Sequence, residues 1–255
     1  MYPPGSTFKL LVAGAALRSV PAAPSETFAC IRLPDGRVGN FVKGSTRPVR
    51  DDPMDTAPHG QVDLRHGLVV SCNAYFAQLA LRLGPQPILD AASLFQIDPA
   101  KPATAAALNR TLAHAGYGQA DVLVSPLKMA RVASSIAANG VVLPVQWTMG
   151  EQPSDEPESR TSKDPRERFL SESDAATLSR YMREAVTAGT GRSLAANATP
   201  IAGKTGTAEV DDGRAHSWFA CSRRSVRIRS GGGSRRPPPP SPRGHPRAPC
   251  APRAR

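Results

Sequence analysis

The sequence lacks any long apolar run. No stretch of the 255 residues approaches the ~20 consecutive apolar side chains that a membrane-spanning helix needs. Met1 is also not followed by a segment that resembles a secretion signal. As written, the chain is therefore expected to have no route of its own out of the cytoplasm.

Cysteine is scarce, and its spacing excludes the common metal motifs. The four cysteines, Cys30, Cys72, Cys221 and Cys250, form no C-x-x-C pair and no metal-type spacing with the five histidines. We therefore expect buried or incidental thiols, no metal site and no cofactor. Cysteine usage of this kind does not indicate a redox compartment.

Acidic residues are absent from the end of the chain, residues 221–255. That segment holds ten of the 32 basic residues, so residues 1–220 keep 22 basic and 21 acidic side chains. The net charge of +11 therefore belongs almost wholly to the tail. Because no aromatic residue lies between its arginines, the tail is not typical of a nucleic-acid-binding segment, and we expect no such partner.

The tail also lacks hydrophobic periodicity. It is rich in Arg, Pro, Gly and Ser, a composition that predicts a disordered segment. The same composition arises when a GC-rich gene is read in the wrong frame. A frameshift after Ala220 is the favoured interpretation, and a natural basic tail is the alternative. Residues 1–220 are long enough for one domain of ordinary size.

Helical and extended patterns alternate along residues 1–220, which predicts a mixed α/β (α+β) fold. Apolar stretches with start and stop signals predict four helices, at residues 8–16, 73–83, 127–138 and 171–188. Turn-rich composition before Gly60 and apolar runs elsewhere predict strands at residues 28–33, 37–42, 200–210 and 216–220. The polar segment 150–168 is predicted to be an exposed loop.

Ser6-Thr7-Phe8-Lys9 is an S-x-x-K motif at the start of the first predicted helix. Positions three apart share a helix face, so the Lys9 amine could reach the Ser6 hydroxyl. A serine becomes a strong nucleophile only when a neighbour takes its proton, and a buried lysine with a lowered pKa can do so. The plainer alternative is a capping serine followed by a surface lysine.

Two further motifs carry polar groups of the same kind. Ser71-Cys72-Asn73 is S-x-N at a helix entrance, where a hydroxyl and an amide could point into one cleft, or simply cap the helix. Lys204-Thr205-Gly206-Thr207 lies on a predicted strand, where Gly206 permits close backbone approach and the Thr207 N–H could bind an oxyanion. Its alternative is a glycine-containing strand beside a surface lysine.

The order S-x-x-K, S-x-N, K-T-G is the signature of serine penicillin-recognising enzymes. It also sets aside a second S-x-x-K match at Ser125, because that match follows the S-x-N motif. The flanking sequences YPPGSTFK, VDLRHGLVVSCNAYFAQLA, GYGQ and PIAGKTGTAEV closely resemble class B penicillin-binding proteins. The resemblance covers residues 2–220.

The resemblance implies a D,D-transpeptidase that cross-links peptidoglycan through an acyl-enzyme on Ser6 and binds penicillin covalently. Lys9 would be the general base, and Ser71, near Lys204, would shuttle a proton. The residues implied to bind the stem peptide or its terminal carboxylate, besides Lys204, are Asn73, Thr205, Gly206 and Thr207, with the Ser6 and Thr207 N–H groups as oxyanion hole. Gly118 and Gln119 would line the cleft, or belong to a plain turn.

The resemblance also implies a fold and a setting. The fold would be that of the D,D-transpeptidases and β-lactamases, an antiparallel sheet flanked by helices. The family has an anchor, a non-catalytic module and sheet strands before S-x-x-K, and further strands after residue 220, so strands are expected to be missing at both ends. The parent protein would act at the inner membrane with its catalytic domain outside the cytoplasm. Its partners would be D-Ala-D-Ala stem peptides, β-lactams and a membrane glycosyltransferase.

Other interpretations share parts of this pattern. A serine β-lactamase has the same motifs but needs an additional base to activate water, and the sequence offers no compelling candidate. A penicillin sensor would be acylated without transpeptidation. The chain could also be an inactive fragment, or a basic protein whose tail binds nucleic acid.

Overall fold

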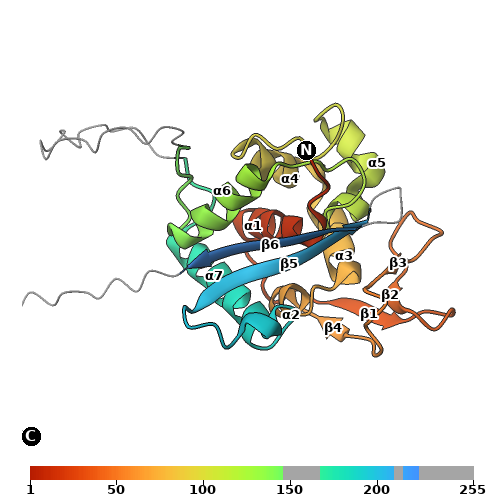
Figure 1. Cartoon of the computed structure of the whole chain (residues 1–255). Helices are drawn as coiled ribbons and strands as arrows, with labels where there is room; N and C mark the ends of the chain where they lie inside the picture. Colours follow the sequence, from red (N-terminus) through yellow and green to blue (C-terminus); the bar gives the residue numbers. More distant parts are fainter. Residues whose placement is uncertain (146–166, 210–214, 224–255) are drawn as a thin grey trace, which may run out of the picture. The chain divides into compact units, whose positions relative to one another are not determined.

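A long antiparallel hairpin faces the viewer in Figure 1. It consists of β5 (Ile201–Glu209) and β6 (Ala215–Arg223), paired from Ile201 with Arg223 to Glu209 with Ala215. The computed structural model describes residues 1–145, 167–209 and 215–223, and the hairpin belongs to the same unit as the rest of them. Residues 150–166 of the predicted loop and the tail beyond residue 223 lie outside the described residues.

Both hairpin strands were predicted, and both are confirmed. β6 continues to Arg223, three residues into the segment that the sequence assigned to the tail. The division of the chain at residue 220 stays a prediction. Helix α7 (Glu172–Thr187) packs against β5 and α6 (Pro126–Ala137) against β6, so the helices cover one face of the hairpin.

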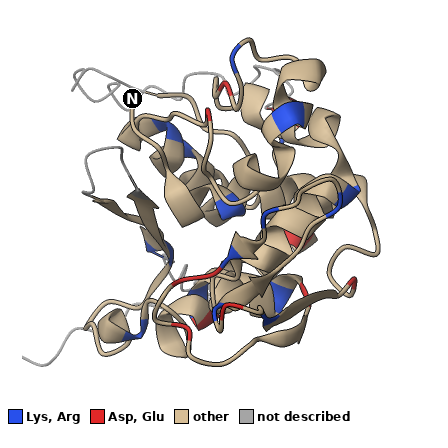
Figure 2. Cartoon of the chain, turned by 90° about the vertical axis from the view of Figure 1, so that its right-hand side faces the viewer, with Lys and Arg blue, Asp and Glu red and all other residues tan. Residues whose placement is uncertain are grey.

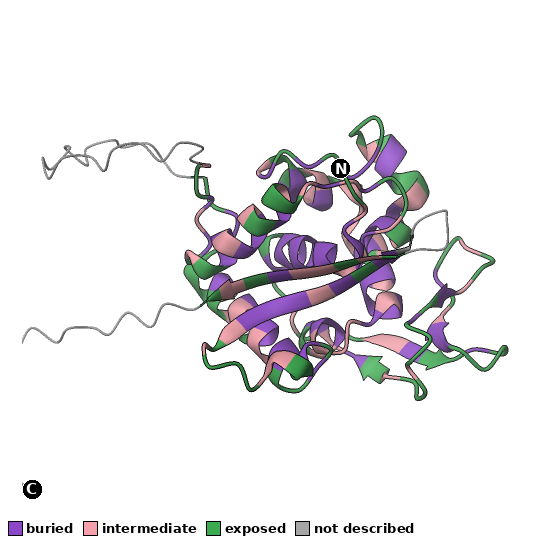
Figure 3. Cartoon of the chain, viewed as in Figure 1, coloured by how far each residue is buried: buried purple, intermediate pink, exposed green. Residues whose placement is uncertain are grey.

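The central helix α1 (Lys9–Ser19) is buried on all sides, as the colours of Figure 3 show. Every residue from Lys9 to Leu17 is buried, because the run KLLVAGAAL offers no polar face apart from Lys9 itself. Gly14 is required by packing, since a methyl group there would lie 2.1 Å from the Phe169 ring. A short 3₁₀ helix, η1 (Gly5–Phe8), precedes α1.

The four predicted helices are confirmed within two or three residues. The third of the chain's helices, α3 (Asn73–Leu83), has the predicted bounds, and its N-cap is Cys72, whose sulfur accepts the Tyr75 N–H. α6 and α7 begin after serine caps, Ser125 and Ser171.

A second antiparallel sheet has the strand order β3-β2-β1-β4. Its strands are β1 (Phe28–Arg32), β2 (Val38–Asn40), β3 (Val49–Arg50) and β4 (Gly60–Val62), and α3 packs against β1. β1 and β2 were predicted, whereas β3 and β4 are too short to produce a pattern. Together the two sheets and the helices confirm the predicted mixed α+β class with antiparallel sheets.

Three helices were missed by the sequence analysis: α2 (Leu64–Val69), α4 (Pro85–Ser93) and α5 (Ala105–Ala115). Gly84-Pro85 is typical of a helix stop, but Pro85 is also the first residue of α4, where a missing N–H costs nothing. A second 3₁₀ helix, η2 (Arg192–Leu194), follows α7. Within the described ranges, no helix has the length and hydropathy to cross a bilayer.

Positive and negative side chains are interspersed over the elements in Figure 2. This distribution matches the near-zero net charge of residues 1–220.

Candidate active site

The three sequence motifs meet at one cleft with a volume of about 1100 Å³. It is lined, among others, by seven of the ten predicted site residues: Ser6, Ser71, Asn73, Gln119, Thr205, Gly206 and Thr207. Lys9 and Lys204 lie beneath this lining and are fully buried. The structure therefore brings together residues that are far apart in the sequence, with hydroxyls at the surface and amines below.

Ser6 lies on η1, half-buried, and β5 presses directly against this short helix. Gly5 has φ +51°, and a methyl group there would lie 2.3 Å from the Thr207 carbonyl oxygen. On the facing strand, a methyl group on Gly206 would lie 2.9 Å from the Thr7 nitrogen. Glycine on both sides lets the backbones around Ser6 and Thr207 approach closely.

Gly118 packs against Gly5, the first residue of η1. Its φ is +82°, and a methyl group there would lie 2.0 Å from the Gly5 carbonyl oxygen. The Gly5 N–H donates to the Gly118 carbonyl at 3.1 Å. Gly118 therefore holds η1 through its backbone, whereas the neighbouring Gln119 lines the cleft.

The Lys9 amine is bound to the S-x-N motif. Its Nζ donates to the Ser71 carbonyl at 2.5 Å, to Ser71 Oγ at 3.2 Å and to Asn73 Oδ1 at 2.7 Å. The sequence analysis expected this amine to reach Ser6. Among the described residues, Ser6 Oγ has no hydrogen-bond partner, because the Lys9 side chain extends toward the more numerous acceptors of residues 71 and 73.

Burial lowers the pKa of Lys9 from 10.5 to about 8. The negative charges of Asp51 and Cys72 act in the opposite direction and limit the change. The amine also lies 5.5 Å from the centre of the Phe76 ring. Lys9 is thus a buried amine that can lose its proton under mildly basic conditions.

Ser71 and Asn73 do not cap α3, so the capping alternative does not hold. Cys72 is the cap residue, and Ser71 has a positive φ of +64° that turns its side chain from the helix axis to the cleft. The Asn73 side chain donates through Nδ2 to the Arg50 carbonyl at 3.0 Å, and the backbone N–H of Asn73 donates to Asp51. Both motif side chains are therefore free of helix capping.

Lys204 is the second buried amine. Its Nζ donates to the Thr205 carbonyl at 3.0 Å. Burial, and then the charge of Lys9, hold its pKa well below the usual range. The neighbouring Thr205 Oγ1 lies 2.6 Å from Thr190 Oγ1, which joins β5 to the loop after α7.

The second S-x-x-K match is an ordinary helix start. Ser125 Oγ accepts the Lys128 N–H at 3.3 Å as the N-cap of α6, and the Lys128 side chain donates to the Gln96 carbonyl away from the cleft. The order of the motifs selected Ser6 over Ser125, and the structure places only Ser6 in the cleft.

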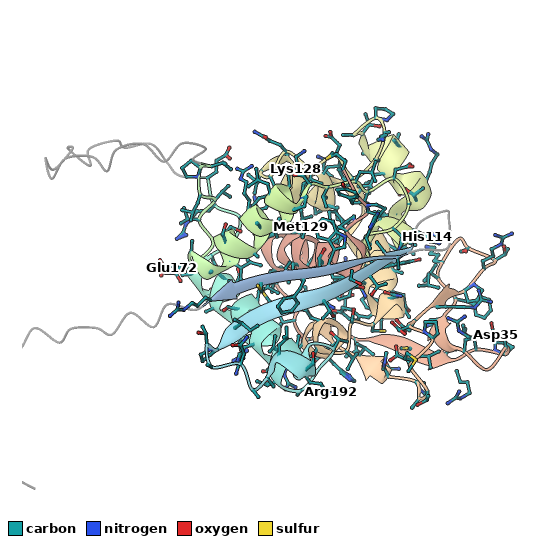
Figure 4. All side chains as sticks on the ribbon, in the orientation of Figure 1. Asp35, His114, Lys128, Met129, Glu172 and Arg192 are labelled. Carbon is teal, nitrogen blue, oxygen red and sulfur yellow. The ribbon has the colours of Figure 1, made fainter. Side chains whose placement is uncertain are left out.

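The cleft contains further residues that the sequence analysis did not find. His114 at the end of α5 and Arg192 on η2, both labelled in Figure 4, line it together with Thr190 and Arg50. Of these, only Thr190 has a local sequence signal, because it lies between Gly189 and Gly191, a spacing typical of a turn. The buried carboxylate of Asp51, which binds the Asn73 backbone, had none.

A family model for the penicillin-binding protein transpeptidase domain matches residues 1–222. Peptidoglycan D,D-transpeptidase PbpA of Mycolicibacterium smegmatis is 30% identical over 236 residues, which are 86% of this chain and 46% of the relative. PbpA of Mycobacterium tuberculosis H37Rv is 31% identical over 153 residues, 56% of this chain and 30% of the relative. The chain thus spans less than half the length of these relatives.

The fold of this chain is similar to the folds of solved transpeptidase structures. The imipenem acyl-enzyme of penicillin-binding protein A from M. tuberculosis superposes with a TM-score of 0.61 at 28% identity, covering 86% of this chain and 52% of that one. The D,D-transpeptidase domain of a peptidoglycan glycosyltransferase from Eggerthella lenta has a TM-score of 0.66 at 24% identity, covering 88% and 57%, and shows the shared fold.

Proposed function

The chain belongs to the penicillin-binding protein transpeptidase family, and on this premise we propose that it carries the acyl-transfer site of a peptidoglycan D,D-transpeptidase. The observation behind the proposal is the buried Lys9 amine, which lies below the cleft and is bound by Ser71 and Asn73. A lysine with a lowered pKa can accept a proton from a serine hydroxyl near neutral pH. The relatives named PbpA support the same reaction.

The resting state would be the protonated lysine. Three acceptors surround Lys9 Nζ, which matches the three protons of an ammonium group. With a pKa of about 8, roughly a tenth of the amine is neutral at pH 7. This neutral fraction would be the reactive one.

Acylation would start when neutral Lys9 removes the Ser6 Oγ proton. Ser6 Oγ then attacks the carbonyl carbon of the penultimate D-alanine, and a carbon–oxygen bond forms. As the carbon–nitrogen bond breaks, the leaving amine of the terminal D-alanine receives a proton from Lys9 through Ser71. The hydroxyl of Ser71 is suited to this relay, because it lies 3.2 Å from Lys9 Nζ.

Transfer would reverse these roles. An amine of a neighbouring stem peptide attacks the Ser6 ester and loses its proton to Lys9. The carbon–nitrogen bond of the cross-link forms, the carbon–oxygen bond to Ser6 breaks, and Lys9 returns the proton to Ser6 Oγ. A β-lactam would acylate Ser6 by the same first step, but its opened ring keeps the leaving nitrogen attached.

Charge in the transition state would be stabilised where η1 meets β5. The backbone N–H groups of Ser6 and Thr207 would bind the oxyanion, a contribution of ~3–4 kcal/mol for a donor of this kind. The close approach of Gly5 to Thr207 supports this assignment. Thr205 and Thr207, in front of Lys204, would bind the terminal carboxylate of the substrate.

The substrate class also suggests a setting. Peptidoglycan stem peptides lie outside the cytoplasmic membrane, so the catalytic site would act there. The parent protein would work beside a membrane glycosyltransferase that supplies the glycan strands.

The test is incubation of the purified chain with penicillin G, followed by intact-mass measurement. We expect one penicilloyl group per chain, absent in Ser6→Ala and retained in Ser125→Ala, which removes the serine of the other S-x-x-K match. Retention of the adduct in Ser6→Ala would overturn the proposal. Rapid turnover of nitrocefin, instead of a stable adduct, would identify a β-lactamase.

A further inference from the structure

A short segment after α7 forms one wall of the cleft, to which it contributes Thr190 and Arg192. The backbone N–H of Thr190 donates to the Val69 carbonyl at 3.3 Å. The hydroxyl of the same residue, Thr190 Oγ1, lies 2.6 Å from Thr205 Oγ1. The segment is therefore attached both to the chain just before the S-x-N motif and to the strand that carries K-T-G.

Backbone contacts fix the point from which the Arg192 side chain starts. A methyl group on Gly189 would lie 2.2 Å from the Val69 carbonyl oxygen, so the segment packs closely at this glycine. The Gly191 N–H donates to the Ala185 carbonyl at 2.9 Å, and the Arg192 N–H donates to the Gly189 carbonyl at 3.2 Å. η2 therefore begins at a defined place beside the end of α7.

The guanidinium of Arg192 has no partner within the described ranges. The side chain is exposed, and it takes part in no hydrogen bond or ion pair there. The two other arginines that line the cleft are engaged. Arg50 forms an ion pair with Asp35 at 2.8 Å, and Arg37 donates to the Asp51 carbonyl at 3.5 Å. Arg192 is therefore available to a ligand that enters the cleft.

A guanidinium is chemically suited to a carboxylate. Its N–H donors form a planar fork that can bind both carboxylate oxygens, and its charge is permanent. In Figure 4, Arg192 lies on the side of the hairpin formed by β5, the strand that carries Thr205 and Thr207. The hydroxyls of these threonines can donate hydrogen bonds to a carboxylate, but they bring no charge.

Lys204 is poorly placed to supply that charge. Its amine is fully buried and donates to the Thr205 carbonyl at 3.0 Å. Burial, and then the charge of Lys9, hold the pKa of Lys204 well below its usual range. Because a carboxylate that leaves water is unfavourable unless it is paired, a cation at the surface of the cleft would favour its binding.

We propose that Arg192 determines specificity for ligands with a carboxylate, by binding the terminal carboxylate of the donor stem peptide or the matching carboxylate of a β-lactam. Thr205 and Thr207 orient this group through neutral hydrogen bonds, and Arg192 supplies the charge. The inference rests on the proposed transpeptidase function and adds a residue to its donor site. The alternative is a solvated surface arginine, which is common in proteins.

The experiment compares penicillin G with its methyl ester, in which the carboxylate charge is removed. Acylation of the full chain is followed by stopped flow, and the Ser6 adduct is confirmed by intact mass. Arg192→Gln should lower the second-order acylation rate of penicillin G about 10-fold, the lower end of what a hydrogen bond to a charged group contributes. The rate with the methyl ester should stay close to that of the wild type.

Three further measurements separate ligand binding from a structural role. The loss in Arg192→Gln should appear as weaker non-covalent binding of penicillin G, with an unchanged limiting rate of acylation. Added salt should slow the wild-type reaction with penicillin G more than that of the variant, because salt screens the charge pair. Arg192→Lys, which keeps the charge but not the fork, should retain part of the preference for the acid.

Arg110→Gln is the matched control. It removes an exposed positive charge on α5, outside the cleft lining, and should behave as the wild type with both compounds. Equal effects of Arg192→Gln on the acid and the ester, or no effect on either, would overturn the inference and leave the proposed function intact. A wild-type chain that forms no Ser6 adduct would overturn the proposed function, and this inference with it.

Discussion

Lys9 Nζ donates to Asn73 Oδ1 at 2.7 Å, which joins the first turn of α1 to the first residue of α3. This contact links the S-x-x-K and S-x-N motifs through one buried proton. The three predictions below concern that amine and the backbone of η1, which carries Ser6.

Acylation by penicillin is expected to depend on the protonation of Lys9. Because the pKa of Lys9 is about 8, its neutral fraction increases about tenfold between pH 7 and pH 9. The second-order acylation rate should increase by a similar factor and then level off. The pKa of Lys9 is also raised by the nearby charges of Asp51, Asp52, Asp55 and Cys72. Lys9 and Lys204 repel each other when both are protonated. The midpoint of the pH–rate profile is therefore measured directly, by stopped-flow acylation. A rate that is flat from pH 6 to pH 9 would exclude Lys9 as the base.

Asn73→Asp should move that midpoint to higher pH. The new carboxylate would lie at the position of Asn73 Oδ1, against the Lys9 ammonium, and would favour the charged form. At pH 7 the acylation rate should decrease by about tenfold for each unit of pKa increase. Gln61→Glu places the same charge on exposed β4 and serves as the control, with an unchanged profile. An unchanged midpoint in Asn73→Asp would contradict the assignment.

Gly118→Ala should destabilise the protein by more than the strain of a positive φ alone. Gly36 has the same φ of +82° but open space around it, whereas a methyl group on Gly118 would meet the Gly5 carbonyl at 2.0 Å. Gly36→Ala is expected to cost ~1–2 kcal/mol of unfolding free energy, the cost of a left-handed residue. Gly118→Ala should cost more and also slow acylation, because η1 must move.

Urea unfolding and penicillin acylation measure the two effects. If Gly36→Ala and Gly118→Ala had equal unfolding free energies and equal acylation rates, the close contact between Gly118 and η1 would not contribute to stability or acylation.

The sequence predicted elements that have clear start and stop signals. α3 was predicted with its observed bounds, because an apolar run ends at Gly84, which has a positive φ. α2 was missed because six residues give less than two turns of periodicity. β3 has two residues, and its existence depends on pairing with β2 rather than on its own composition.

The site was predicted in its members but not in its contacts. Motif order placed Ser6, Ser71 and Thr207 in one cleft, yet helical spacing suggested that Lys9 would face Ser6. The observed contact with Asn73 depends on the packing of α1 against α3, which no local pattern encodes.

The two buried amines also determine how the site responds to an anionic ligand. Below pH 8, Lys9 carries a proton, and its charge helps to keep Lys204 neutral. When Lys9 gives up its proton during catalysis, this repulsion disappears, and the affinity of Lys204 for a proton increases. Burial is still the larger cause of the low Lys204 pKa, so Lys9 is the buried amine whose charge changes. A carboxylate bound at Thr205 and Thr207 would therefore feel an attraction that changes with the protonation of Lys9.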